Sequence, residues 1–249
     1  MDHPRTLPHG PLRLVGDGVY VVTGEMHIAP LVRIPRNMVV IADEGELTLV
    51  NAVRLSDAGE AELARLGTVR HLVKLGAFHD RDDPYYVERF APRFWAVPGA
   101  SHREPLTADG DLMEDAPRLP IPRMRVVRFS VRRPEAALFV PRLGGLLVTC
   151  DCLHTLGTMG GYSRAARAGL WMLGFRRAPV VVPPTWLRAV TDDRAALARD
   201  FARALELPFD NLIAGHGEPL LGGAKEAARA AVERTFGELP SETSEPANT

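Results

Sequence analysis

Three apolar runs of strand length each end in polar side chains that can do chemistry, and this repeated pattern constrains the fold most. In an α/β sheet the carboxyl ends of neighbouring strands converge on one crevice, where ligands bind. Carboxylates and imidazoles gathered there are typical ligands of a divalent cation. The sequence therefore predicts a metal-type site. The runs and their polar ends are 69–75 before His79-Asp80-Arg81-Asp82-Asp83, 145–150 before Asp151, and 211–214 before Gly215-His216-Gly217.

Composition narrows the function classes. A chain of 249 residues can bury one large core or two modest ones, and its formal net charge of -1 is not the basic balance of a nucleic-acid or anionic-membrane partner. We expect neither partner. The two cysteines, Cys150 and Cys152, are too close for an ordinary structural disulfide, and no run has the length of a membrane span or a secretory core. We therefore expect a cytoplasmic protein.

The order of the predicted elements indicates two strand-then-helix halves. Strands 38–41 and 47–50 flank the turn signal Asp43-Glu44-Gly45, which is typical of a hairpin. A helix is expected between Ser56 and Gly67, and two more where small and apolar residues recur with helical period near 198–205 and 224–232. Thr191 or Asp192 could cap the helix near 198–205. We predict an α/β fold, a four-layer α/β/β/α sandwich, as one domain over residues 1–240 with a disordered tail at 241–249.

Taken in order, these segments resemble the metallo-β-lactamase superfamily over most of residues 12–236. The resemblance includes the opening 17–22 (Asp-Gly-Val-Tyr-Val-Val), the Leu-Leu-Val-Thr-x-Asp segment that ends at Asp151, and the late Gly-His-Gly. The family's main metal motif is His-x-His-x-Asp-His. Here the first histidine and the aspartate match His79 and Asp83, whereas the second histidine is Arg81 and the last is Pro84.

The resemblance implies a metal site that is degenerate. Asp151 matches the aspartate that bridges two metals, and His216 matches the final histidine. The family's third metal-binding histidine falls at Arg132 or its neighbour Arg133. Arginine offers only donors and cannot be a ligand, so Arg81 and Arg132 would instead place positive charge beside the carboxylates or bind a small anion.

Two functions follow from this reading. In the first, a hydrolase-like enzyme holds at most one zinc, iron or manganese through Asp83, Asp151 and His216, with His79 as a further ligand or general base. His79 and Asp83 are its candidate catalytic residues. Its substrate would be a small ester, thioester, lactone or phosphoester. In the second, a non-catalytic relative binds a small anionic ligand or a protein partner in the arginine-containing crevice, and its polar groups only hydrogen-bond the loops together.

Other candidates have plainer interpretations beside their functional ones. Cys150 and Cys152 are predicted to be small buried core residues, although Cys152 follows the strand end and could be reactive. His154 is either a loop histidine or a substitute ligand that reaches the crevice. The apolar segment 162–186 is predicted to be an amphipathic helix with a core-covering loop. It could also wall the crevice for a hydrophobic substrate or form a homodimer interface.

Overall fold

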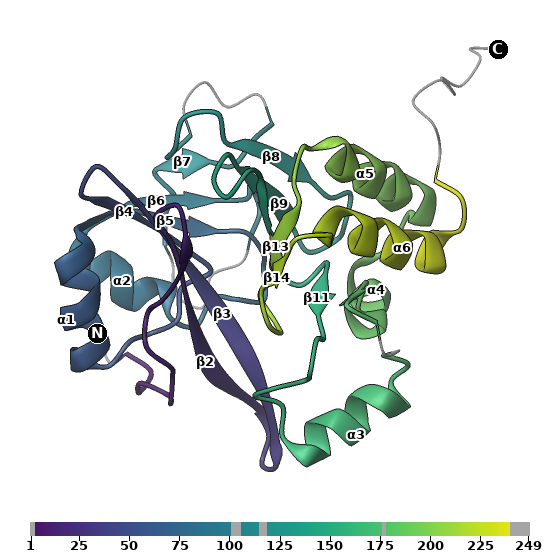
Figure 1. The fold of residues 1–249 in the computed structure, drawn as a ribbon, viewed down its shortest axis with the longest axis horizontal. Helices are drawn as coiled ribbons and strands as arrows, with labels where there is room; N and C mark the ends of the chain where they lie inside the picture. The colour runs from purple at the N-terminus through teal and green to yellow at the C-terminus, as the bar shows by residue number, and fades with distance from the viewer. Residues whose placement is uncertain (1–2, 101–105, 115–118, 176–177, 240–249) are drawn as a thin grey trace.

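The fold contains two main β-sheets in a computed structural model that describes residues 3–100, 106–114, 119–175 and 178–239 (Figure 1). The first sheet runs in sequence order and the second in the order β14-β13-β10-β9-β8, with a two-stranded β11-β12 sheet beside them. The strands of the first sheet are β1 Arg13–Gly16, β2 Val19–Ala29, β3 Val32–Asp43, β4 Glu46–Val50, β5 Thr68–Lys74, β6 Arg93–Ala96 and β7 Gly110–Asp111. Those of the other two are β8 Arg125–Arg128, β9 Ala136–Val140, β10 Leu146–Val148, β11 His154–Thr155, β12 Val180–Val181, β13 Asn211–Ile213 and β14 Leu220–Leu221.

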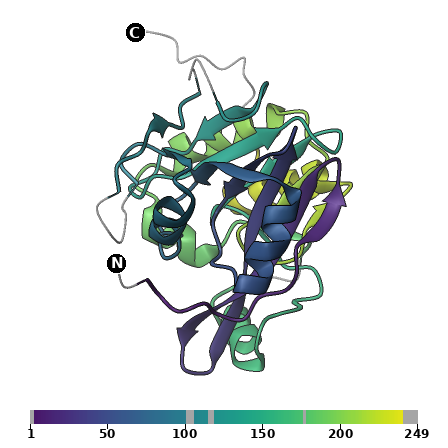
Figure 2. The ribbon, with the colours of Figure 1, turned by 90° about the vertical axis from the view of Figure 1, so that its left-hand side faces the viewer.

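Six helices lie in the described residues, and most of them cover the outer faces of the two sheets. They are α1 Asp57–Leu66, α2 Asp83–Phe90, α3 Arg164–Met172, α4 Pro184–Val190, α5 Arg194–Glu206 and α6 Ala224–Phe236. Figure 2 shows α1 and α2 in front of the first sheet, while α5 and α6 lie behind the second. Helix α3 stands apart, beside the protruding β2–β3 hairpin (Figure 1).

Three apolar clusters separate the four layers. One contains alternate residues of both sheets, such as Val39 and Leu138, and fills the space between them. The other residues of the first sheet pack with α1 and α2 through Leu63 and Tyr86. The outer face of the second sheet packs with α4, α5 and α6, where Phe201 lies at the centre. The predicted α/β/β/α sandwich is therefore the observed arrangement.

Local sequence signals placed most elements correctly. The β3–β4 hairpin pairs Asp43 with Glu46, and its two turn residues, Glu44 and Gly45, both have positive φ as the hairpin turn requires. Ser56 caps α1 by accepting a hydrogen bond from the amide of Gly59. The cap of α5 was predicted at Thr191 or Asp192, but the structure places it at Asp193, whose carboxylate accepts two amide hydrogen bonds from the first turn.

The strands that carry the predicted site end at a common edge. Strand β5 is parallel to β4 and β6 in the first sheet, and β10 is parallel to β13 in the second. Two buried asparagines tie the sheets together at this edge, because Asn37 donates to the carbonyls of Ala214 and Gly217 and Asn51 donates to that of Thr149. The loops after β10 and β13 are thereby held against the first sheet.

Both cysteines are free and buried, as expected of core residues. Strand β10 ends at Val148, and beyond it Cys150 lies between the sheets while Cys152 lies in the layer under the helices. Among the described residues, no helix has the length and apolar character needed to cross a membrane. The tail predicted at 241–249 lies outside the described residues.

We expect Leu138→Ala to destabilise the protein by about 2–5 kcal/mol, because Leu138 is fully buried between the sheets and the truncation leaves a cavity there. Leu14→Ala is the matched control, since Leu14 is 57% exposed. Urea unfolding of both variants measures the difference. Equal free energies of unfolding would contradict the two-sheet packing.

Candidate metal centre

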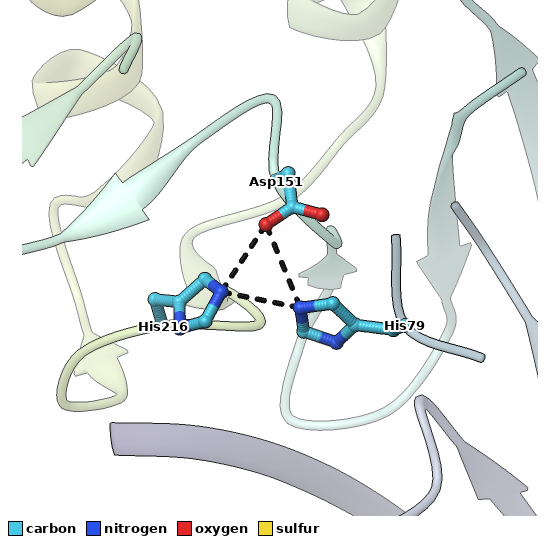
Figure 3. Close-up of side chains that lie close together, drawn as sticks. All are labelled: His79, Asp151 and His216. Atoms are coloured by element: carbon cyan, nitrogen blue, oxygen red, sulfur yellow. Dashed lines mark hydrogen bonds and ion pairs between the residues drawn. The ribbon is translucent and has the colours of Figure 1, made fainter. Parts of the chain in front are cut away.

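Three side chains from three distant loops meet at the common strand edge. His79 follows β5, Asp151 follows β10 and His216 follows β13, and all three side chains are buried (Figure 3). The Nε2 atoms of the two histidines are 3.1 Å apart. Asp151 Oδ1 lies 3.5 Å from Nε2 of His79 and 3.1 Å from Nε2 of His216. The three polar run ends therefore converge on one point, as the sequence predicted.

These separations fit a bound metal ion. Two atoms that bind one tetrahedral zinc at about 2.0–2.1 Å stand roughly 3.3 Å apart. The three observed distances, between 3.1 and 3.5 Å, bracket that value. The side chains of His79, His216 and Asp151 could thus hold a divalent cation with little movement.

The tautomer of His216 strengthens this interpretation. Its Nδ1 lies 2.6 Å from the carbonyl oxygen of Pro35, which can only accept, so Nδ1 carries the proton and donates. In the neutral ring Nε2 is then a bare lone pair that faces the carboxylate oxygen of Asp151. Two acceptors at 3.1 Å repel unless a proton or a cation lies between them. A backbone carbonyl on the second ring nitrogen is also the usual arrangement for a metal-bound histidine.

Close backbone approach explains the Gly-His-Gly sequence around His216. A Cβ on Gly215 would lie 2.6 Å from the carbonyl oxygen of Cys150, and one on Gly217 would lie 1.5 Å from that of Thr155. Gly217 also has a φ of 96°, which favours glycine. The loop of His216 can therefore lie directly against the loops that follow β10.

A buried glutamate, Glu135, holds Asp151 in place. Its Oε1 accepts hydrogen bonds from the amides of Asp151 at 2.7 Å and Cys152 at 2.6 Å, and its Oε2 accepts one from Trp186 Nε1 at 2.8 Å. Burial, and then the charge of Asp151, raise the pKa of Glu135 to about 8, although the two amide donors oppose that shift. The sequence analysis missed Glu135, for which the one available signal was a carboxylate directly before an apolar strand.

The cluster is arranged electrostatically for a cation. Burial lowers the pKa of His79 to about 4, so this ring is neutral near pH 7 and can offer a lone pair. The neighbouring imidazoles, that of His79 foremost, hold the pKa of Asp151 well below its ordinary value, against the effect of burial. The ionised carboxylate of Asp151 thus lies beside the neutral ring of His79.

The structure does not bring Asp83 into this group, although we predicted it as a ligand and catalytic residue. Its Oδ2 accepts a hydrogen bond from Lys74 Nζ at 3.3 Å, and both side chains are buried. Lys74 also donates to the carbonyl oxygen of His79. The buried ammonium at the end of β5 requires a counter-charge, and Asp83 at the start of α2 supplies it. Lys74 was detectable as one of two lysines in the chain.

The two arginines predicted to bind an anion in the crevice lie elsewhere. Arg81 pairs with Asp82 at 2.6 Å and donates to the carbonyl of Arg5. Arg132 pairs with Asp192 at 3.0 Å, and its side chain is 51% exposed. Each arginine therefore pairs with a carboxylate outside the cluster. The buried Asp82 is also paired with Arg36 at 3.2 Å, which fixes the loop after His79.

His154 lies at the border of the cluster. Its Nε2 is 3.8 Å from Asp151 Oδ1, and its ring centroid is 4.6 Å from that of His216. Burial lowers its pKa to about 4. The His79–Asp151–His216 group, whose ligand atoms lie within 4.8 Å of one another, does not include it.

An apolar cleft of about 730 Å³ opens beside His154. The ring of Phe175, which lines this cleft, lies 6.0 Å from the ring of His154. Helix α3 forms one wall, and Arg167 contributes a charge there. Within 162–186 the described residues form the predicted helix, α3, and then strand β12 and the start of α4, and the segment also borders a cleft near the cluster. Further lining residues are Leu156, Met159, Leu170, Trp171 and Pro179.

Comparison with solved structures shows the fold. A metallo-β-lactamase from Erythrobacter litoralis matches with a TM-score of 0.57 at 16% identity over 90% of this chain and 92% of its own. FIM-1 from Pseudomonas aeruginosa, in a mono-zinc form, matches with 0.59 at 13% identity over 94% and 98%. An enzyme from Hirschia baltica matches with 0.58 at 15% identity over 91% and 98%. This chain has the metallo-β-lactamase fold. No protein-family model and no curated protein sequence matches it.

We expect Asp83→Ala to lower the free energy of unfolding by about 3–5 kcal/mol, because it leaves the buried ammonium of Lys74 without its counter-charge. The double variant Lys74→Met, Asp83→Leu removes both charges and should be less destabilised than Asp83→Ala. Chemical denaturation of the two variants provides the comparison. If Asp83→Ala unfolds at the wild-type denaturant concentration, the pair does not stabilise the loop.

The lowered pKa of His79 predicts a pH-dependent stability in the metal-free protein. The unfolded histidine has a pKa of 6.5 and the folded one about 4, so the unfolded state binds more protons between these values. The contribution of His79 therefore falls as the pH falls from 6.5 to 4, by up to roughly 3 kcal/mol. Glu135 has a raised pKa, so its contribution to stability rises as the pH falls, opposite to that of His79. The test therefore compares the acid sensitivity of wild type with that of a His79 variant.

Urea unfolding with a chelator at pH 7 and pH 4.5 measures this difference for wild type and His79→Gln. The variant should lose less stability than wild type on acidification. His27→Ala, at an exposed histidine, is the control and should behave as wild type does. Identical acid sensitivity of wild type and His79→Gln would show that the folded ring titrates normally.

Proposed function

We propose that this protein is a hydrolase-like enzyme that binds one divalent metal ion through His79, Asp151 and His216. The observation that carries the proposal is the convergence of two histidine Nε2 atoms on the carboxylate of Asp151, with His216 held from its other ring nitrogen by the carbonyl oxygen of Pro35. Two imidazoles and one carboxylate are suitable ligands for zinc and iron, and manganese is the third metal that we propose. FIM-1, which shares the fold, has been crystallised in a mono-zinc form.

A divalent cation bound there would polarise a carbonyl or phosphoryl oxygen and acidify a coordinated water. The chain's own residues supply the surroundings. Glu135 and Pro35 orient Asp151 and His216, and Lys74 fixes the backbone at His79. Asp151, with 12% of its side chain exposed, is the most accessible of the three ligands, so a substrate would approach from its side.

The apolar cleft beside Phe175 indicates the kind of substrate. A small ester, thioester, lactone or phosphoester could place its reacting group at Asp151 and an apolar substituent in the cleft. The anion-binding form of the non-catalytic alternative depended on arginines in the crevice, and both arginines pair with other carboxylates. A crevice that binds a protein partner remains the second candidate. A cytoplasmic location remains our prediction and agrees with two free, buried cysteines.

Elemental analysis of the protein purified without a histidine tag tests the metal. We expect about one equivalent of zinc, iron or manganese in wild type, and loss of metal in Asp151→Ala and His216→Ala because each removes one of three ligands. His27→Ala, at an exposed site, should keep its metal. Wild-type protein without metal, and without any gain in stability when zinc is added, would remove the proposal.

Activity is tested separately on metal-loaded protein with nitrophenyl esters, thioesters, lactones and phosphoesters that carry short or long apolar groups. We expect turnover of at least one class, lost in Asp151→Ala. Metal binding without turnover of any class would leave a metal-binding protein and contradict the enzymatic part.

A further inference from the structure

We propose that His154 is a fourth metal-binding side chain, so that three imidazoles and one carboxylate hold the cation. This inference rests on the proposed function, because it concerns the same metal ion. Its starting observation is that three histidine Nε2 atoms, those of residues 79, 154 and 216, lie at 3.5, 3.8 and 3.1 Å from one oxygen, Asp151 Oδ1.

The Nε2 atom of His154 needs a partner. It is buried, and it has no hydrogen-bond partner within the described part of the chain. A buried polar atom without a partner costs free energy, and such atoms in native proteins usually mark an unseen water, an ion or a function. This atom faces the carboxylate oxygen on which the other two rings converge. A cation near that oxygen would satisfy it.

The backbone holds His154 close to His216. Strand β11 pairs His154 with Val181, and the next residue, Thr155, donates its amide to the carbonyl oxygen of His216 at 3.1 Å. Phe175 packs near the His154 ring on its cleft side. The loop of His216 and strand β11 are therefore hydrogen-bonded to each other. This connection keeps His154 and His216 close enough to bind the same ion.

Binding needs His154 to move toward the other ligands as a set, because it lies outside the group whose ligand atoms are within 4.8 Å of one another. The distance to Asp151 shows one part of that movement. Two ligands of one tetrahedral zinc stand roughly 3.3 Å apart, and His154 Nε2 lies 3.8 Å from Asp151 Oδ1. A rotation of the ring that brings Nε2 a few tenths of an ångström closer to Oδ1 makes that distance a ligand separation. A neutral imidazole adds a lone pair without adding charge beside the ion.

His154 also increases the number of imidazoles at the site. With His79 and His216 it gives the cluster three imidazoles, and it comes from a position three residues after Asp151. Three imidazoles with one carboxylate favour zinc, and cobalt in its place, over the oxygen-preferring magnesium and calcium. The expected ion is therefore a transition metal of borderline softness such as zinc or cobalt.

Metal affinity and spectroscopy test the inference without reference to activity. Wild type, His154→Ala, His154→Gln and the control His27→Ala are titrated with zinc against a chromophoric chelator, and with cobalt while the visible absorption is recorded. We expect both His154 variants to bind zinc at least about 10-fold more weakly than wild type and to give weaker, shifted cobalt bands. His27→Ala should match wild type.

X-ray absorption of zinc-loaded wild type provides a second measurement that needs no variant. Three imidazoles in the zinc shell would support the inference, and two would overturn it. Unchanged zinc affinity and cobalt spectra in folded His154→Ala would also overturn it, while leaving the three-ligand proposal intact. Wild type that binds neither zinc nor cobalt would instead overturn the proposed function, so the two failures are distinguishable.

Discussion

The organisation of this site depends on one buried carboxylate oxygen, Asp151 Oδ1, toward which three imidazoles are directed. A buried charge is stable only with partners, and a cation bound between the carboxylate and the three rings would supply one. Around this point the chain places fixed acceptors and donors. Pro35 sets the tautomer of His216, and Glu135 holds the backbone at Asp151. The geometry is thus imposed by residues that do not themselves touch the centre.

The two-sheet packing makes this convergence possible. Strand β5 belongs to one sheet, and β10 and β13 belong to the other, so the side chains at their ends meet only because the sheets stack with their edges aligned. Asn37 and Asn51 fix that alignment through hydrogen bonds to the loops of the second sheet. The metal-type site is therefore a property of the sandwich, and an error in the stacking would separate its ligands.

Two carboxylates in the loop after β5 are paired with side-chain cations and not with the site. Asp83, at the position of a metal-binding aspartate, forms a buried pair with Lys74, and Asp82 is shared by Arg36 and Arg81. These ion pairs keep the loop after β5 in place. The chain thus has the metallo-β-lactamase fold with a cluster of His79, Asp151 and His216, and Asp83 lies outside that cluster in an ion pair.

The sequence was sufficient for the features that depend on local patterns. Alternating apolar residues, the Glu44–Gly45 turn and the Ser56 cap predicted their elements, and the order of those elements predicted the four layers. It was also sufficient for the meeting of His79, Asp151 and His216, because strand ends converge in this fold. The partner of Asp83 and the role of Glu135 depend on packing between segments far apart in the chain, which no local pattern encodes.

The most direct test of this account is a crystal structure of the zinc-soaked protein, with anomalous diffraction recorded on both sides of the zinc edge. The account predicts one anomalous peak at about 2.0–2.2 Å from Nε2 of His79, Nε2 of His216 and a carboxylate oxygen of Asp151. The absence of a peak there, with the imidazoles hydrogen-bonded directly to Asp151, would contradict it.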